Sequence, residues 1–408
     1  MADFIQNGSI TTLHNLRNRN LEDFERQLHT WGRERPMALV LPSLFSELEG
    51  PALDHIVEQL RAATYIRQII IGLDRADEGQ FRHAVEFFAR LPQEHRILWH
   101  DGPRLRAVDR VLAEADLAPP EPGKGRNVWY CMGYFLASDL CKSLALHDCD
   151  ILTYDRGLPA KLFYPIAHPT FTYKFCKGYY FRASDTKLNG RVTRLLVTPL
   201  LRALKQMFGD HEFLEYIDSF RYPLAGEFSM VWDLVHSIRI PSDWGLEIGV
   251  LSEAHRLYSP QRICQVDIAD AYDHKHQDLS ADDMSRGLAK MSTDICKAFF
   301  RKLAITGVVF NRGVLRTLKA AYYRTALDLV EQYHADADYN GLTLDRHLEE
   351  RAIELFTETL VRAGNDFLKN PHETPFLPSW NRVVSAVPDI YERLVDAVEA
   401  DAMMTGMR

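Results

Sequence analysis

The feature that most constrains the fold is an alternation of short apolar runs with helical patterns in the first half of the chain. The apolar runs occupy 37–41, 68–72 and 96–100. Amphipathic helices are expected after them, over 51–63, over 78–91 and over a polar stretch ending near 115. Because strands that are joined through helices run in the same direction, this pattern predicts an α/β fold with a parallel sheet.

Toward the C-terminus this alternation gives way to helices. A long helix is expected over 127–142, a strand over 143–147, a β-prone aromatic stretch over 171–181 and a buried helix over 192–207. Beyond 276 the strand pattern fades, and helical patterns lie near 284–303, 314–334 and 344–361. The length of 408 residues favours more than one core. We therefore predict a helical N-terminal arm (1–35), a central α/β domain (36–280) and a mainly helical C-terminal subdomain (281–408).

Composition excludes several classes of function. The formal net charge is −8, and no run of Lys and Arg is long enough to follow a phosphate backbone, so nucleic acid is not an expected partner. No apolar segment reaches the length of a membrane span, and the N-terminus lacks the pattern of a signal peptide. The six cysteines form no CxxC pair, which is typical of reduced thiols. We expect a cytoplasmic protein without a membrane partner.

The most informative motif is Asp148-Cys149-Asp150, which comes directly after the strand expected over 143–147. Open α/β sheets bind ligands beyond the carboxyl ends of their strands. Two carboxylates at such an edge suit a hard cation, Mg²⁺ or Mn²⁺, that neutralises a diphosphate. An isolated Asp-x-Asp is more often a solvated turn, so this interpretation depends on the neighbouring segments.

Three further segments lie where the sheet would bind a nucleotide. The loop 41–47 follows the first strand, where backbone amides and Glu47 can meet a base and a ribose. Asp74 follows the second strand and can accept from ribose or base, although a turn or helix cap explains it equally well. Lys124, between two glycines, places a cation on a loop that can approach a pyrophosphate, without the spacing of a P-loop.

Two other segments suit the acceptor and the metal. Residues 189–193 (NGRVT) precede a helix and combine free amides, an Arg and a hydroxyl, which together make an anion site or an ordinary N-cap. Asp243 and Glu247 flank a Trp, and 273–276 (DHKH) places two imidazoles at a strand exit. A histidine there can complete a metal shell with Asp150, although paired histidines are more often surface residues.

In their order along the chain, these segments resemble the glucosyl-3-phosphoglycerate synthases, which are retaining glycosyltransferases of the GT-A fold with a Rossmann-like nucleotide-binding sheet. The resemblance spans about 35–279 and rests on LPSLFSE (41–47), PGKG (122–125), DCD (148–150), CKGYYFR (176–182), GRVTRLLVTPLL (190–201), PLAGEF (223–228), WGLEIGVL (244–251) and DHKHQ (273–277). Mannosylglycerate-type synthases share some of these elements, so the resemblance defines the fold and chemistry better than the sugar.

The resemblance also implies roles for single residues. It assigns donor contacts to Leu41, Pro42, Ser43, Glu47, Gly72, Lys124 and Asp148. It assigns the metal to Asp150 and His274, and the acceptor to Gly190, Arg191, Val192 and Thr193. Glu247 falls on the active-site carboxylate, and Asp243 replaces it if the mannosylglycerate-type pattern applies. The loops PSLFSE and GLD depart from the commoner forms of the family, which leaves the base undecided.

The resulting hypothesis is glucose transfer, with retention, from UDP-glucose or GDP-glucose to D-3-phosphoglycerate in the presence of Mg²⁺ or Mn²⁺. The resemblance further implies a homodimer. One alternative is a synthase that uses unphosphorylated glycerate or GDP-mannose. Another is a protein that binds a nucleotide-sugar without turnover, and the presence of Asp148, Asp150 and His274 argues against it. A sugar-1-phosphate nucleotidyltransferase is disfavoured because its Gly-rich N-terminal signature is missing.

Overall fold

The structure is a computed structural model that describes residues 6, 8–17, 19–184, 186–270, 272–273, 287–371 and 376–404. Within these residues, eight strands form one sheet. Their order across the sheet is β1 (Thr11–Leu13), β8 (Ile263–Ala269), β6 (Phe175–Tyr180), β7 (Phe228–Val231), β5 (Ser143–Leu146), β2 (Met37–Leu44), β3 (Ile66–Asp74) and β4 (Glu94–Trp99).

The three strands from which a parallel sheet was predicted, β2, β3 and β4, pair in parallel, but the sheet as a whole is mixed. All neighbours pair in parallel except β7, which runs antiparallel to both β5 and β6. The chain leaves β6 at the carboxyl edge, forms α7 (Thr198–Phe208) and α8 (Glu212–Asp218), and re-enters the sheet at the same edge. The strand that follows must therefore run back, and no crossover helix is needed between antiparallel neighbours.

Side chains of β2 alternate between two cores, as the period of two in a strand requires. Ala38 and Val40 point into one hydrophobic cluster, and Leu39 and Leu41 point into the other. The first cluster receives α4 (Pro103–Glu114), α5 (Lys124–Ser138), α9 (Trp232–Ser237), α10 (Leu246–Leu257) and α15 (Ile390–Met404). The second receives α1 (Leu21–Gly32), α2 (Pro51–Ala62), α3 (Glu78–Phe88) and α6 (Gly157–Ala167). The predicted α/β class is confirmed as a sheet covered by helices on both faces.

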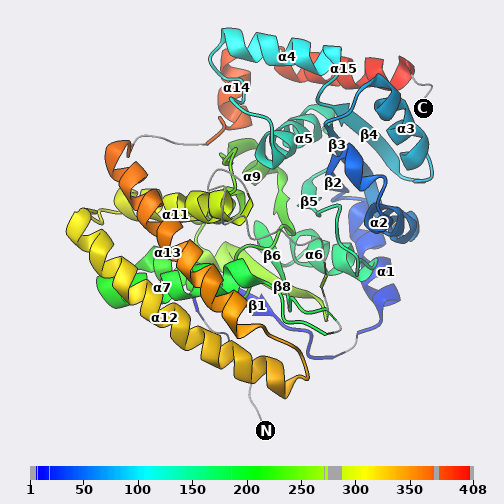
Figure 1. The fold of residues 1–408 in the computed structure, drawn as a ribbon. Coiled ribbons are helices and arrows are strands. Elements are labelled where there is room, and N and C mark those ends of the chain that lie inside the picture. Colours follow the sequence, from blue (N-terminus) through cyan, green and yellow to red (C-terminus); the bar gives the residue numbers. More distant parts are fainter. Residues whose placement is uncertain are drawn as a thin grey trace.

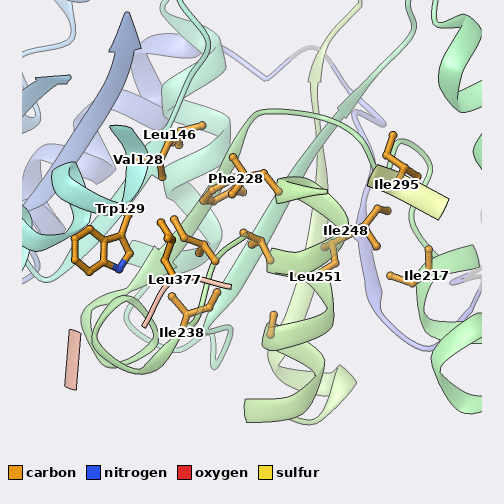
Figure 2. Packing of buried hydrophobic residues seen from close by; sticks show 14 of the residues in the cluster. Val128, Trp129, Leu146, Ile217, Phe228, Ile238, Ile248, Leu251, Ile295 and Leu377 are labelled. Atoms are coloured by element: carbon orange, nitrogen blue, oxygen red, sulfur yellow. The ribbon is translucent and has the colours of Figure 1, made fainter. Parts of the chain in front are cut away.

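The first cluster ties distant segments of the chain together. Val128 and Trp129 of α5, Phe228 of β7 and Ile248 of α10 belong to this cluster, which continues to Ile295 of α11 (Gly287–Ile305) (Figure 2). Burial of aliphatic and aromatic side chains of this size is the main stabilising term of such a core. This core holds the C-terminal helices against the sheet.

The C-terminal third is helical, as predicted. It contains α11 (Gly287–Ile305), α12 (Arg312–Tyr339), α13 (Arg346–Lys369), α14 (Trp380–Ala386) and α15. Asn311 and Asp345 begin α12 and α13 as N-caps, because their side chains accept from the amides of Val314 and Leu348. Helices α11, α12 and α13 pack together, and α12 also packs on α7, whereas α15 lies along α4 at the opposite end of the molecule (Figure 1).

The division into three domains remains a prediction, and the structure adds two contacts across its boundaries. Within 1–35, Thr11–Leu13 form β1 and pair with β8, so this segment is not helical throughout. At the other end of the chain, α15 packs on α4, α5 and β4 of the central region. Both terminal segments therefore help to build the layers around the sheet.

Gly133 of α5 is where the C-terminal segment meets the central region most tightly. A Cβ at this position would lie 2.0 Å from Cζ2 of Trp380, whose ring stacks on Trp129 and whose Nε1 donates to the Trp129 carbonyl. Replacing glycine by alanine in a helix normally gains about 1 kcal/mol. Overpacking a rigid core costs about 1–3 kcal/mol, and an overlap this deep belongs at the upper end.

We therefore expect Gly133→Ala to lower the midpoint of thermal unfolding. Gly79→Ala is the matched control, because Gly79 is also helical and the nearest atom to a Cβ there is 3.4 Å away. Differential scanning calorimetry of both variants checks the prediction. An unfolding midpoint for Gly133→Ala that equals or exceeds that of Gly79→Ala would contradict this packing.

Candidate active site

The carboxyl edge of the sheet gathers most of the predicted site residues. Strands β2, β3, β5, β6 and β8 all end there, and the antiparallel β7 begins there. The strand exits therefore bring together the 41–47 loop, Asp74, the pair Asp148 and Asp150, and Tyr272. This arrangement is the ligand edge of an open α/β sheet.

Lys124 is the centre of the charged contacts at this edge. Its Nζ lies 2.6 Å from Oδ1 of Asp148 and 3.4 Å from Oε1 of Glu247. Burial lowers the pKa of Lys124, but the carboxylates of Asp148 and Glu247 outweigh burial and the pKa is raised. The amine therefore stays charged, and it links the donor motif to the predicted catalytic carboxylate.

Glycines allow the two loops that carry this cluster to come close. A Cβ on Gly226 would lie 2.4 Å from Oδ2 of Asp148, and one on Gly125 would lie 2.2 Å from the Pro241 carbonyl. A side chain at Gly226 would displace the Asp148 loop from β7. A side chain at Gly125 would displace the start of α5 from the 241–247 loop. The geometry of the Lys124 cluster depends on both contacts.

Asp150 lies in a region of concentrated negative charge. Burial, together with the charges of Asp148, Glu47 and Glu227, raises the pKa of Asp150 to about 7. The carboxylates here outnumber the neighbouring positively charged side chains. Their hard oxygens are a donor set that suits Mg²⁺ or Mn²⁺. His274, the other predicted metal ligand, lies outside the described residues, and among the described ones no three His, Cys, Asp or Glu side chains form a complete metal cluster.

A buried carboxylate, Glu227, lies at this edge and was not predicted as part of the site. Tyr180 donates to one of its oxygens at 2.9 Å and Tyr272 to the other at 2.7 Å, and the two rings stack with centroids 3.6 Å apart. Burial and the nearby Asp148 raise the pKa of Glu227. Tyr272 is two positions before the predicted ligand His274 in the sequence, and Glu227 holds Tyr272 at this edge. In the sequence, the signal that could have identified Glu227 was a charged residue directly before an apolar strand.

Lys177 is a second cation near the cluster, and it was not predicted. It lies on β6, donates to the Ala225 carbonyl and is fully buried. Burial lowers its pKa to about 8, against the opposing charges of Glu247 and Glu227. It partly balances the carboxylates at this edge.

Apart from Lys124 and Asp148, the predicted donor residues lie at the exits of β2 and β3. Leu41 and Ser43 are buried, and Pro42 and Glu47 are half-buried. Asn127 of α5 donates to the Gly72 carbonyl and to Asp74, both at 2.9 Å. A Cβ on Gly72 would lie 1.8 Å from Oδ1 of Asn127, so this glycine allows the close approach of α5.

Asn127 was not predicted as a positioning residue. His100, directly after β4, was not predicted either. The imidazole is buried, and neither ring nitrogen has a hydrogen-bond partner among the described residues. Burial lowers the pKa of His100, opposed by the nearby Asp74. A histidine directly after a strand was its only sequence signal.

The predicted acceptor segment begins a helix whose first turns are irregular. A π-helical turn, Thr193–Val197, follows Gly190, which has φ +76°, and runs into α7. Pro199 has no N–H to donate to the Leu195 carbonyl, and the hydroxyl of Tyr322 on α12 donates to it instead at 2.7 Å. Such π-turns are frequent at functional sites.

Two arginines of this segment share one carboxylate. Nε of Arg191 lies 3.1 Å from Oε1 of Glu349, and a terminal amine of Arg194 lies 2.7 Å from Oε2. Glu349 is buried in the first turn of α13, a helix that was predicted but given no role. Tyr333 of α12 places its ring 5.0 Å from the guanidinium carbon of Arg194.

The structure separates the two candidate catalytic carboxylates. Glu247 lies in the first turn of α10 and contacts Lys124. Asp243 accepts from the Gly245 amide at 2.9 Å, and burial with the nearby charge of Asp294 on α11 raises its pKa to about 6. Of the two, Glu247 is the one in ion-pair contact with the cluster at the carboxyl edge.

A cavity of about 540 Å³ lies beside β1 and β8. It is lined by the N-terminal segment and α6, and Arg17, Arg19 and Lys161 are among its lining residues. None of the predicted site residues lines it.

Among the described residues, no helix has both the length and the apolar character needed to cross a membrane.

Sequence comparison finds relatives that match almost the whole chain. A glucosyl-3-phosphoglycerate synthase from Persephonella marina is 46% identical over 401 residues, which are 98% of this chain and 99% of the relative. One from Methanococcoides burtonii is 40% identical over 98% of both chains. No protein-family model matches the sequence.

Solved structures show the same fold at lower identity. The glucosyl-3-phosphoglycerate synthase of Mycobacterium tuberculosis, solved with Mn²⁺, UDP-glucose and phosphoglyceric acid, has a TM-score of 0.54 at 19% identity and covers 74% of this chain and 89% of its own. The mannosyl-3-phosphoglycerate synthase of Rubrobacter xylanophilus has a TM-score of 0.52 at 21% identity, over 71% and 85%. The predicted GT-A fold is confirmed.

Proposed function

Because the chain belongs to the glucosyl-3-phosphoglycerate synthase family, we propose that it transfers glucose, with retention, from UDP-glucose or GDP-glucose to the C2 hydroxyl of D-3-phosphoglycerate. The observation that carries this proposal is the contact of Lys124 with both Asp148 and Glu247. It joins the donor motif to the carboxylate expected near the acceptor. The mycobacterial enzyme has been solved with UDP-glucose and phosphoglyceric acid, in support of the same substrate classes here.

The donor would lie across the exits of β2, β3 and β5. In this proposal Lys124 approaches the diphosphate, and the 41–47 loop with Gly72 and Asp74 surrounds the base and ribose. An amine already surrounded by carboxylates can exchange one of them for a phosphate oxygen at little cost in desolvation. The nucleotide stays open, because Asp74 can accept hydrogen bonds from the base or from the ribose.

The metal would be held by Asp150 and His274. When bound, Mg²⁺ or Mn²⁺ supplies positive charge next to the leaving diphosphate. The crowding of Asp148, Glu47 and Glu227 around Asp150 supports this assignment, because a cation offsets their repulsion. Mycobacterial relatives solved with Mg²⁺ or Mn²⁺ and UDP are consistent with it.

The acceptor would lie at the helix start of Gly190, Arg191, Val192 and Thr193, with Arg191 facing an anionic group. The bond between the anomeric carbon and the donor phosphate breaks, and a bond to the acceptor C2 oxygen forms on the same face. The hydroxyl proton passes to the leaving phosphate oxygen. Glu247 orients the hydroxyl, and Asp243 is the second candidate for that role.

Two further proposals concern the whole protein. All six cysteines are free and buried, which supports a reducing, cytoplasmic location. A homodimer is proposed from the family resemblance alone, and light scattering on the purified protein measures it directly.

The proposal is tested by release of nucleoside diphosphate from UDP-glucose, GDP-glucose and GDP-mannose, each with 3-phosphoglycerate or glycerate as acceptor. We expect release to require a glucose donor, 3-phosphoglycerate and a divalent metal. Faster release with glycerate or GDP-mannose would favour the alternative synthase. Binding of nucleotide without release in any combination would favour a non-catalytic protein.

A further inference from the structure

The acceptor segment is completed from outside the central region by Glu349. This residue is separated by 158 positions from Arg191, yet its two oxygens bind Arg191 and Arg194 separately. The docking of α12 and α13 brings it there, because the Thr343 amide between these helices donates to the Thr186 carbonyl at 2.7 Å. The same hairpin supplies Tyr322 and Tyr333 to this segment.

Glu349 contacts only the Nε edge of the Arg191 guanidinium. The contact uses Nε, and among the described residues neither terminal amine of Arg191 forms a hydrogen bond. The side chain of Glu349 is 4% exposed, whereas that of Arg191 is 30% exposed. The carboxylate therefore lies behind the guanidinium and leaves its outer face accessible.

Other polar atoms of this segment also lack partners. Nδ2 of Asn189 and Oγ1 of Thr193 are buried without a hydrogen-bond partner among the described residues. Nε of Arg182 is equally buried and unpartnered, and a Cβ on Gly190 would lie 3.3 Å from Cβ of Arg182. Buried donors of this kind normally have a partner, and an anionic group would supply it.

We propose that Glu349 is a positioning residue for the acceptor. It orients the Arg191 guanidinium so that both terminal amines face an anionic group of 3-phosphoglycerate, and it neutralises the buried Arg194 behind it. This inference rests on the proposed function. Glu349 is not placed to compete with the acceptor anion, because its side chain is buried and contacts Nε of Arg191, while the terminal amines stay unoccupied among the described residues.

The test is steady-state kinetics of Glu349→Gln in the full-length protein. The amide keeps the size of the side chain, removes the charge and turns one acceptor into a donor that faces a guanidinium. We expect the KM for 3-phosphoglycerate to rise about tenfold, which is a loss of about 1.4 kcal/mol, with the KM for the donor changed less than twofold. A KM for 3-phosphoglycerate that is unchanged or lower would overturn the proposal.

Glu399→Gln is the matched control. Glu399 also comes from a C-terminal helix and holds an arginine of the central region, since Nε of Arg96 lies 2.9 Å from its Oε1 and Tyr134 donates to it at 2.8 Å. It lies on α15, away from the acceptor segment. We expect its loss to affect the unfolding midpoint and to leave the KM for 3-phosphoglycerate unchanged.

Testing Glu349→Gln in an Arg191→Lys variant shows whether Glu349 acts through Arg191. Arg191→Lys keeps the positive charge but lacks the Nε that Glu349 holds, so adding Glu349→Gln to it should raise the KM for 3-phosphoglycerate little further. Fully additive effects would overturn the positioning role. If Glu349→Gln does not fold, Glu349→Asp keeps the charge on a shorter arm and must show the same acceptor-specific rise.

The outcome separates this inference from the proposed function. If the wild-type protein forms no product from any donor and acceptor, the proposed function fails before Glu349 is tested. If the wild type is active and Glu349→Gln matches it in both KM values, only the positioning role fails.

Discussion

An Asp150→Asn variant is expected to lose about 1000-fold or more in turnover, the scale of removing a principal electrostatic contribution to a transition state. The substitution keeps the size of the side chain and removes one hard anionic ligand. Asp148, Glu47 and Glu227 remain nearby, but Asp150 is the carboxylate assigned to the cation. The measurement is the rate of nucleoside diphosphate release at saturating donor and acceptor over a range of Mn²⁺ concentrations.

Two comparisons make this result specific. EDTA should reduce the wild-type rate to the level of the variant and should have little effect on the variant itself. Asp139→Asn is the control, because Asp139 is an exposed carboxylate beyond the far end of α5 that pairs with Lys142 at 3.2 Å. A variant that keeps more than a tenth of the wild-type rate would remove Asp150 from the metal site.

A Lys124→Met variant is the second large effect, with an expected loss of about 100–1000-fold in kcat/KM for the donor. The amine lies 2.6 Å from Asp148 and 3.4 Å from Glu247. Its removal leaves both carboxylates beside the donor diphosphate without their cation, so repulsion replaces attraction. The KM for 3-phosphoglycerate, measured at saturating donor, should change far less.

Lys142→Met is the matched control. Lys142 lies just beyond the C-terminal end of α5, is half-exposed and, among the described residues, forms its ion pair with Asp139. Exposed pairs of this kind contribute about 0–1 kcal/mol to stability. Wild-type kcat/KM is expected for this control. Equal losses in the two variants would show a general effect of removing a lysine charge, and would contradict a direct role of Lys124 at the donor.

Local patterns predicted the fold where each element carries its own signal. The strand expected over 143–147 is β5 (Ser143–Leu146), and the helix expected over 78–91 is α3, which starts at its capping residue Asp77. The three-residue β1 was missed, because its pairing with β8 joins residues about 250 positions apart. The four-residue β7 was also missed, and its antiparallel direction depends on where the chain re-enters the sheet.

The site was predictable only in part. Asp148, Lys124 and Glu247 were selected from motifs, and the structure brings them into contact. Asn127, Glu227 and Glu349 were not selected, because their roles depend on partners in distant segments. Periodicity explains a buried helix face, but it cannot show that a glutamate in the first turn of α13 lies against two arginines of the predicted acceptor segment.

The central claim is tested most directly by identifying the product that the purified wild-type protein makes from ¹³C-labelled NDP-glucose and 3-phosphoglycerate. The predicted result is metal-dependent formation of a phosphate-bearing product in which NMR places an α-glucosyl group on the C2 oxygen of the glycerate. A labelled product that lacks the phosphate, carries the β configuration or consists only of free glucose would contradict the proposed transfer.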